Sequence, residues 1–141
     1  VCNWQQQIFP VAMTQPGREL AKLLGEDLPA DAEPSRAYTD PARMFVRDVR
    51  TGLDRGEPFE LEVVVLGDRP QAAELRSRPL GEREFLSAPL THVARGVYHV
   101  ALPADAVTND FEYHVRATVG GKTLVFPATA PAINQTVVVT E

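Results

Sequence analysis

The sequence predicts a mainly β protein, an antiparallel β-sandwich of seven or eight strands preceded by a short helical flank. Three observations carry this prediction. Short segments that alternate apolar and polar residues recur between residues 43 and 141, and turn signals separate them about every 8–12 residues. No helical period lies between these segments. The 141 residues include 12 prolines and 9 glycines, which suit the many chain reversals of an all-β domain.

A short amphipathic helix is predicted in the flank, residues 1–25. Pro16 suits the first helical turn, where its missing N–H needs no partner. Gly25 suits the position just after a helix. Between them, three leucines repeat at helical spacing and form what we call the leucine stripe: Leu20, Leu23 and Leu24. A helix of about 9–10 residues is marginal alone, so we expect the leucine stripe to pack on a partner surface.

A linker is predicted over residues 26–42, between the flank and a β domain of residues 43–141. Three prolines and five acidic residues fall within this segment. Pro29, Pro34 and Pro41 prevent a regular helix or a central strand. The segment is therefore expected to connect the two parts, or to lie across a surface as a strap.

Two segments of the β domain, 59–66 and 111–119, carry clear strand patterns, because every second side chain is apolar. Their predicted core faces are Phe59, Leu61, Val63 and Val65, and Phe111, Tyr113, Val115 and Ala117. Gly120-Gly121 predicts a two-residue hairpin turn, since both residues can adopt positive φ. The other predicted strands are 43–50, 73–78, 84–93, 97–102, 122–126 and 135–140. Pro89 places 84–93 at a sheet edge.

This number of strands and this spacing of turns are typical of an immunoglobulin-like β-sandwich. A small barrel is the alternative architecture. The chain lacks the paired cysteines and the buried tryptophan of an antibody domain, so that branch is excluded.

The run from 96 to 117 resembles the E–F portion of a fibronectin type III or related immunoglobulin-like domain. Accessory domains of this kind in bacterial secreted, carbohydrate-active enzymes often have a Tyr-x-Val strand, a Leu-Pro connection and a Tyr-x-Val-x-Ala strand. The corresponding segments are Tyr98-His99-Val100, Leu102-Pro103 and Tyr113-His114-Val115-Arg116-Ala117. The resemblance covers about residues 43–141, places Tyr113 at the tyrosine corner, and implies a secreted or periplasmic protein.

The flank is similar to the end of a larger catalytic domain, such as a glycoside hydrolase barrel. The similarity rests on Asn3-Trp4, on Ile8-Phe9-Pro10 and on the helix that follows. It implies that catalysis resides upstream in the same polypeptide. It also implies that Trp4 and the leucine stripe form an interface with that upstream domain.

Charge and cysteine content exclude several classes of function. The formal net charge is −5, which argues against nucleic-acid or anionic-membrane partners. Apolar runs are far shorter than the ~20 residues of a membrane span. The lone cysteine, Cys2, cannot form an internal disulfide or a cysteine-rich zinc site.

The chain begins at Val1 without a signal-peptide pattern, as expected of a mature form or a piece of a longer chain.

Catalytic and metal sites are not predicted in this chain. Glu60 and Glu62 lie about 6.5–7 Å apart on one strand face, a spacing that an acid–base pair in glycan hydrolysis can have. A solvated strand face is the preferred interpretation. His99 and His114 are expected to point outward from opposite sheets, so they cannot share one metal ion. Each of the three histidines, His92 included, is expected to have an ordinary surface role. No nucleotide-binding or nucleophile motif is present, so no cofactor is predicted.

A carbohydrate-binding face is the second hypothesis, because sugar rings stack on exposed aromatic side chains. Trp4, Tyr38 and Phe85 fall outside the predicted core pattern, as does Phe126. The arginines Arg76, Arg78 and Arg83 could bind an acidic polymer, but a solvated strand face is the preferred interpretation. Asn134-Gln135-Thr136 matches a glycosylation sequon, which has meaning only in a eukaryotic secretory protein.

The preferred function is a non-catalytic C-terminal accessory or spacer domain of a larger secreted glycan-processing protein. The alternatives are a carbohydrate-binding module and a stand-alone protein-interaction domain. A spacer should expose an apolar patch around the leucine stripe and no row of aromatic rings. A binding module should present at least two coplanar rings or a groove. An interaction domain should have a long, unprotected edge strand.

Overall fold

The computed structural model describes residues 4–32 and 38–141, and the side chains of Trp4 and Gln5 lie outside this description. Cys2 and Asn3 also lie outside the described residues. The chain forms two compact units, Val1–Thr39 and Asp40–Glu141. Each unit is considered by itself below. Among the described residues, no helix combines the length and the apolar composition that a membrane span needs.

The first unit is helical, and its α-helix confirms the predicted flank helix. α1 spans Gln15–Leu24 with Pro16 in its first turn. Gly25 ends it at φ 74°, and the Gly25 N–H donates to the carbonyl of Ala21 at 2.9 Å. The left-handed conformation costs glycine nothing sterically, which is why the helix stops there. Two π-helical turns, η1 (Trp4–Ile8) and η2 (Pro10–Thr14), precede α1, and a 3₁₀ turn, η3 (Ala30–Ala32), follows it.

The second unit contains ten strands, where the sequence predicted seven or eight. Their bounds are β1 (Arg43–Val46), β2 (Gly52–Asp54), β3 (Phe59–Leu66), β4 (Ala72–Pro79), β5 (Leu86–Pro89), β6 (Thr91–Ala94), β7 (Val97–Leu102), β8 (Phe111–Val119), β9 (Lys122–Phe126) and β10 (Gln135–Thr140). The predicted strand 84–93 divides after Pro89, and its two halves join different sheets. The predicted strand 43–50 ends at Val46, and β2 forms separately after it.

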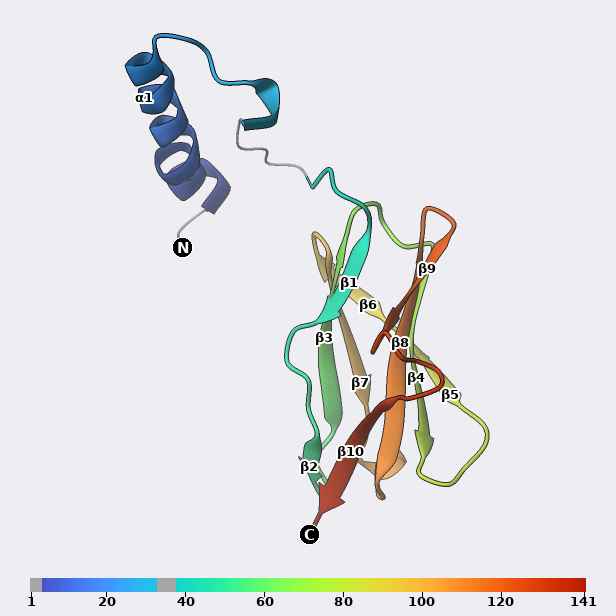
Figure 1. The fold of residues 1–141 in the computed structure, drawn as a ribbon. Coiled ribbons are helices and arrows are strands. Elements are labelled where there is room, and N and C mark those ends of the chain that lie inside the picture. The colour runs from blue at the N-terminus through green and yellow to red at the C-terminus, as the bar shows by residue number, and fades with distance from the viewer. Residues whose placement is uncertain (1–3, 33–37) are drawn as a thin grey trace. The chain divides into compact units, whose positions relative to one another are not determined.

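The strands form two packed sheets, which confirms the predicted antiparallel β-sandwich (Figure 1). One sheet has the order β1-β3-β7-β6. The other has the order β2-β10-β8-β4-β5, and β9 also pairs with β8. With β1, β3, β7 and β6 as strands A, B, E and D, and β4, β8 and β10 as C, F and G, this is the immunoglobulin-like order. All pairs are antiparallel except β2 with β10. The sheets do not close into a barrel.

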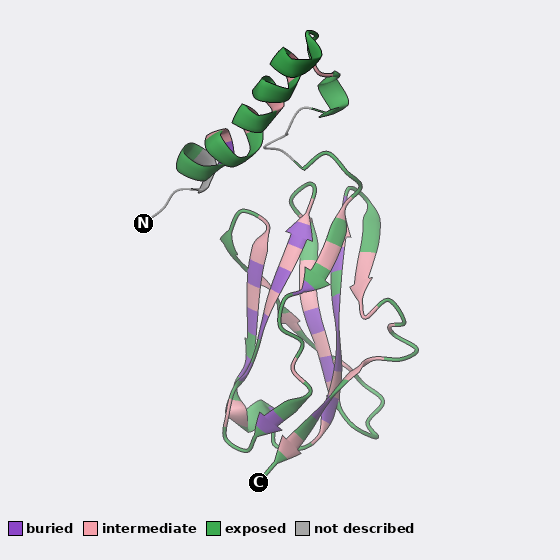
Figure 2. Ribbon diagram, turned by 60° about the vertical axis from the view of Figure 1, so that its left-hand side comes forward, coloured by how far each residue is buried: buried purple, intermediate pink, exposed green. Residues whose placement is uncertain are grey.

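The core lies between the sheets, and it includes every residue of the predicted core faces of β3 and β8. Figure 2 shows buried residues alternating with more exposed ones along the strands. Phe59 of β3 is fully buried, and its ring centroid lies 5.1 Å from each of the rings of Phe111 and Tyr113 on β8. These contacts join the two sheets.

The Tyr113 side chain is buried at the predicted tyrosine-corner position, near the start of β8. Its hydroxyl has no hydrogen-bond partner among the described residues. A tyrosine corner requires that hydroxyl to bond to the backbone upstream, so the hydrogen bond that the resemblance implied is not formed. Burial raises the pKa of Tyr113 well above its ordinary value. The ring therefore contributes packing, and the hydroxyl remains an uncompensated polar group.

The turn between β6 and β7 brings two backbones into contact. A Cβ atom placed on Gly96 would lie 2.3 Å from the carbonyl oxygen of Val65. The Gly96 carbonyl itself accepts a hydrogen bond from the Val65 N–H at 2.8 Å. No side chain fits at Gly96 unless β3 and the turn separate.

Replacing Tyr113 with Phe should leave the free energy of unfolding unchanged or raise it by up to about 1 kcal/mol, because it removes a buried hydroxyl that has no partner. Chemical denaturation of both proteins measures the difference, and Tyr98→Phe is the matched control. A loss above about 1 kcal/mol would reveal a hydrogen bond of the tyrosine-corner type.

Gly96→Ala should lower the free energy of unfolding by about 2–3 kcal/mol, because the new methyl group collides with the Val65 backbone. Gly52→Ala is the control, since nothing lies within 4 Å of its added Cβ. Equal midpoints for the two variants in urea would contradict the close approach at Gly96.

Candidate functional site

A polar cluster occupies the outer face of the sheet that contains β4 and β8. Arg76 and Arg78 of β4 lie opposite His114 and Glu112 of β8, respectively. Their neighbours in sequence, Ser77 and Tyr113, face the core, so strand alternation directs these four side chains outward. Phe85 and Asn134 complete the group. We call these six residues, Arg76, Arg78, Phe85, Glu112, His114 and Asn134, the Phe85 cluster.

Phe85 covers the middle of this cluster. Its ring centroid lies 4.2 Å from the guanidinium carbon of Arg78 and 5.9 Å from that of Arg76. The rings of Phe85 and His114 meet edge to face at 4.9 Å and 70°. The segment before Phe85 is fixed by a hydrogen bond from Arg78 Nη1 to the carbonyl oxygen of Arg83 at 3.0 Å. Phe85 thus lies over the outer side of the polar side chains and makes cation–π contacts with Arg76 and Arg78.

Glu112 is the anionic centre of the cluster. Arg78 Nε and Nη2 both lie 2.7 Å from Glu112 Oε1, and Asn134 Nδ2 donates to Oε2 at 2.8 Å. Burial acts to raise the pKa of Glu112, but the hydrogen bonds from Asn134 and Arg78 outweigh it and hold the pKa below its ordinary value. The carboxylate therefore stays ionised and is the partner of Arg78, one of the three arginines considered as a site for an acidic polymer.

His114 is buried, which corrects the prediction that it has an ordinary surface role. Only 5% of the residue is exposed, although it points outward from its sheet. The cover supplied by Phe85 explains the difference, because strand alternation carries no information about a loop that folds back over a face. Burial lowers the pKa of His114. Three buried atoms of the cluster lack a hydrogen-bond partner among the described residues: Arg76 Nε, His114 Nδ1 and Asn134 Oδ1.

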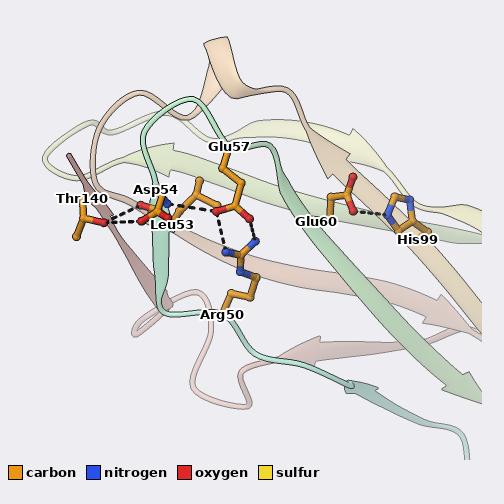
Figure 3. Close-up of polar contacts among 7 residues, drawn as sticks. All are labelled: Arg50, Leu53, Asp54, Glu57, Glu60, His99 and Thr140. Carbon is orange, nitrogen blue, oxygen red and sulfur yellow. Dashed lines mark hydrogen bonds and ion pairs between the residues drawn. The ribbon is translucent and has the colours of Figure 1, made fainter.

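The predicted acidic pair lies on the outer face of the other sheet. Glu60 pairs with His99 at 3.8 Å, as drawn in Figure 3, and Glu62 pairs with Arg47 at 2.9 Å. The side chains lie on one strand, so the geometry is that of a charged, solvated sheet surface.

A second group of polar contacts closes the turn between β2 and β3 (Figure 3). Arg50 binds both oxygens of Glu57 at 2.9 and 3.0 Å. The hydrogen bond to Arg50 is the main cause of a lowered Glu57 pKa. The Thr140 hydroxyl donates to Asp54 Oδ1 at 3.0 Å, which ties the end of β10 to β2. These contacts fix the end of the sandwich and leave no free acid–base pair in it.

The three histidines are dispersed. His99 is on β7 and His114 on β8, in different sheets, as predicted. His92 is exposed on β6, and its Nε2 lies 2.7 Å from the carbonyl oxygen of Arg95. Within residues 4–32 and 38–141, no group of three or more His, Cys, Asp or Glu side chains is arranged to hold a metal ion.

The predicted aromatic residues are not assembled into one described platform. Tyr38 is 36% exposed and belongs to the first unit, whereas Phe85 is half-buried in the second. The Trp4 side chain lies outside the described residues. In the described sandwich, Phe45 of β1, at 45% exposure, is the one aromatic side chain classed as exposed. The hypothesis of a sugar-binding face formed by Trp4, Tyr38 and Phe85 therefore stays a prediction.

The leucine stripe of α1 is exposed. Leu23 is 85% exposed, Leu24 is 56% exposed, and no residue of α1 is buried. The first unit does bury Phe9, just before η2. Its own packing thus leaves the leucine stripe uncovered, and the partner surface expected for this helix stays a prediction.

The sheet edges are poorly suited to pairing with another strand, and the Asn134 side chain of the sequon is already hydrogen-bonded. β1, β2, β5 and β6 end the two sheets and are only three or four residues long. Pro89 ends β5, and β6 has an irregular register between His92 and Ala94. Asn134 Nδ2, to which a glycan would attach, donates instead to Glu112 and to the Pro131 carbonyl.

Glu112→Gln should lower the free energy of unfolding at pH 7 by about 1–3 kcal/mol, because it leaves the half-buried Arg78 without a charged partner. The folded-state pKa of Glu112 is lowered, so its contribution is complete above the unfolded pKa of about 4.3 and is lost as pH falls through the folded pKa. Urea denaturation from pH 7 to pH 3 should therefore show a smaller decline for Glu112→Gln than for the wild type. Glu62→Gln, at an exposed pair, is the control and should lose much less stability at pH 7.

Comparison with known proteins shows the fold. No family model matches the chain, and no curated protein matches it. An engineered protein of known structure is 12% identical, with a TM-score of 0.52, over 72% of this chain and 20% of its own length. A chain from a structure on T cell specificity and activation by the bacterial superantigen toxic shock syndrome toxin-1 is 7% identical, with a TM-score of 0.52, over 71% of this chain and 100% of its own. At such low identity, the shared feature is a β-sandwich fold.

Proposed function

We propose that this chain is a non-catalytic accessory domain of a larger, secreted or periplasmic glycan-processing protein, in which it packs against or positions an upstream catalytic domain. The observation that carries the proposal is the exposed leucine stripe in a chain whose sandwich has its own core. Exposed leucines at helical spacing are typical of a face that another surface covers. The sandwich needs no such partner, because its core is formed between its own two sheets.

The placement of the polar side chains supports a non-catalytic role. Glu60 and Glu62 lie on an outer sheet face, each paired with a basic side chain. Catalytic carboxylates usually lie in a cleft that separates their pKa values. The depression lined by Arg55, Leu80 and Asp110, among others, is open, and its volume is about 370 Å³. The Asp110 carboxylate there accepts the Val139 N–H at 2.8 Å, which is a structural use of that group.

The association with glycan processing comes from the resemblance to fibronectin type III-like domains of bacterial secreted enzymes. The immunoglobulin-like strand order agrees with it, and so do Tyr98 and Tyr113, which both face the core. The missing hydrogen bond at Tyr113 is a departure from that family's pattern. The strand order argues for the sandwich more strongly than for any single family.

A carbohydrate-binding module is the second candidate. Tyr38 is exposed, and the half-buried Phe85 lies beside Arg76 on a sheet face. A stand-alone interaction domain receives less support, because the edge strands are short and interrupted.

The test is to read the open reading frame upstream of residue 1 and to measure binding of that upstream polypeptide to the 141-residue chain by calorimetry. Binding should weaken at least about tenfold when Leu20, Leu23 and Leu24 are replaced together by Glu, since charges cannot be buried in an apolar contact. Lys22→Glu, on the opposite side of α1, is the matched control. An absent upstream domain, or equal binding by the triple variant, would refute the proposal.

Affinity electrophoresis of the same chain through gels that contain polysaccharides distinguishes the second candidate. An accessory spacer should migrate equally in all gels. Retardation in one gel, abolished by Trp4→Ala, Tyr38→Ala or Phe85→Ala, would establish a carbohydrate-binding module instead.

A further inference from the structure

His114 stands apart from the other outward-pointing side chains of the sandwich because it is almost fully buried. Its neighbour on the same face of β8, Arg116, is exposed. The difference arises from the segment 80–85, in which Leu80 to Glu84 are exposed and only Phe85 turns inward onto His114. Phe85 thus packs directly on a buried titratable group.

We propose that Phe85 and His114 form a pH-sensitive latch, in which protonation of His114 releases Phe85, the segment 80–85 and strand β5 from the sheet. The latch goes beyond the proposed accessory role and does not depend on it. Histidine is suited to this task, because its charge changes in the mildly acidic range.

The closed latch is held by few contacts. Phe85 stacks on Arg78, and Arg78 donates to the Arg83 carbonyl. β5 has four residues, pairs only with β4, and is held further by the hydrogen bond from the Ser87 hydroxyl to Glu74. The core side chains of β4 and β8 point to the other face of the sheet. Ala88 of β5 packs against the core from its rim, but no fully buried core residue belongs to 80–89. Release of the latch therefore leaves most of the sandwich core in place, as expected of local opening.

Burial opposes the protonation of His114 most strongly and Arg76 and Arg116 add to it, whereas the neighbouring Asn134 side chain and the Glu74 carboxylate favour the charged form. Arg76 lies directly opposite on β4, Arg116 follows on β8, and Arg78 is part of the same cluster. The carboxylates that face this region already have partners, since Glu112 is bound by Arg78 and Asn134, and Glu74 by Ser87. The charged residues of the covering segment, Glu82, Arg83 and Glu84, are exposed. A proton on His114 would add a fourth cation beside two carboxylates that are already bound.

The closed state also leaves buried polar atoms unpaired. Arg76 Nε, His114 Nδ1 and Asn134 Oδ1 have no hydrogen-bond partner among the described residues. Water would reach these atoms once Phe85 moves away, which favours the open state. Burial lowers the pKa of His114, in agreement with these contacts. The closed state therefore loses stability as pH falls below the ordinary histidine value of about 6.5.

The test combines two measurements on the 141-residue chain between pH 8 and pH 4.5. The His114 ring resonance should titrate with a midpoint below about 6.5, and the midpoint should return toward that value in Phe85→Ala. Amide hydrogen exchange of residues 80–89, corrected for intrinsic rates by the exposed turn at 120–121, should rise by up to about tenfold per pH unit below 6.5. Amides of β3 and β7 should stay protected throughout.

The matched variants are His114→Gln, which should abolish the pH dependence of exchange at 80–89, and His92→Gln, which should retain it. Three outcomes overturn the latch. They are a His114 midpoint at or above 6.5, an unchanged pH dependence in His114→Gln, and loss of protection in β3 and β7 together with 80–89, which would mean global unfolding.

Discussion

The contact of Phe59 with Phe111 and Tyr113 determines most of what the sandwich can present at its surface. Phe59 lies on β3 and the other two rings lie on β8, so these aromatic contacts span the two sheets. They also fix which residues of β3 and β8 face the core and which face outward. Once Phe59 and Tyr113 face inward, strand alternation places Glu60 on one outer face and Glu112 and His114 on the other. A slip of one residue would exchange the core with the charged surface.

The two outer faces then differ because of what covers them. His99 and His114 occupy comparable outward positions on neighbouring strands of the chain, yet His99 is partly exposed beside Glu60 and His114 is buried beneath Phe85. On the first face, ion pairs remain in water and contribute little. On the second, the same residue types are partly removed from water, so hydrogen bonds to Glu112 and the unpaired atoms of Arg76 and Asn134 become energetically significant.

The first unit differs from the sandwich in how much of its apolar surface it buries. Its helix begins and ends where local signals require, at Pro16 and Gly25, but it buries none of its own residues. The sandwich has a core of its own and the helix has an apolar face without one. This contrast is the physical basis of our proposal that the chain is an accessory domain that meets a larger protein through its helical flank.

The sequence alone determined the features that depend on local periodicity: the mainly β class, the buried faces of β3 and β8, the Gly120-Gly121 turn at φ 57° and 77°, and the ends of α1. Only the tertiary structure decided that the predicted strand 84–93 crosses between sheets after Pro89, that Phe85 folds over His114, and that Glu112 takes Arg78 and Asn134 as partners. Contacts of this second kind join residues 22 to 34 positions apart. Hydrophobic alternation records which face of a strand is covered by its own core, but it carries no record of a loop that returns to cover the other face.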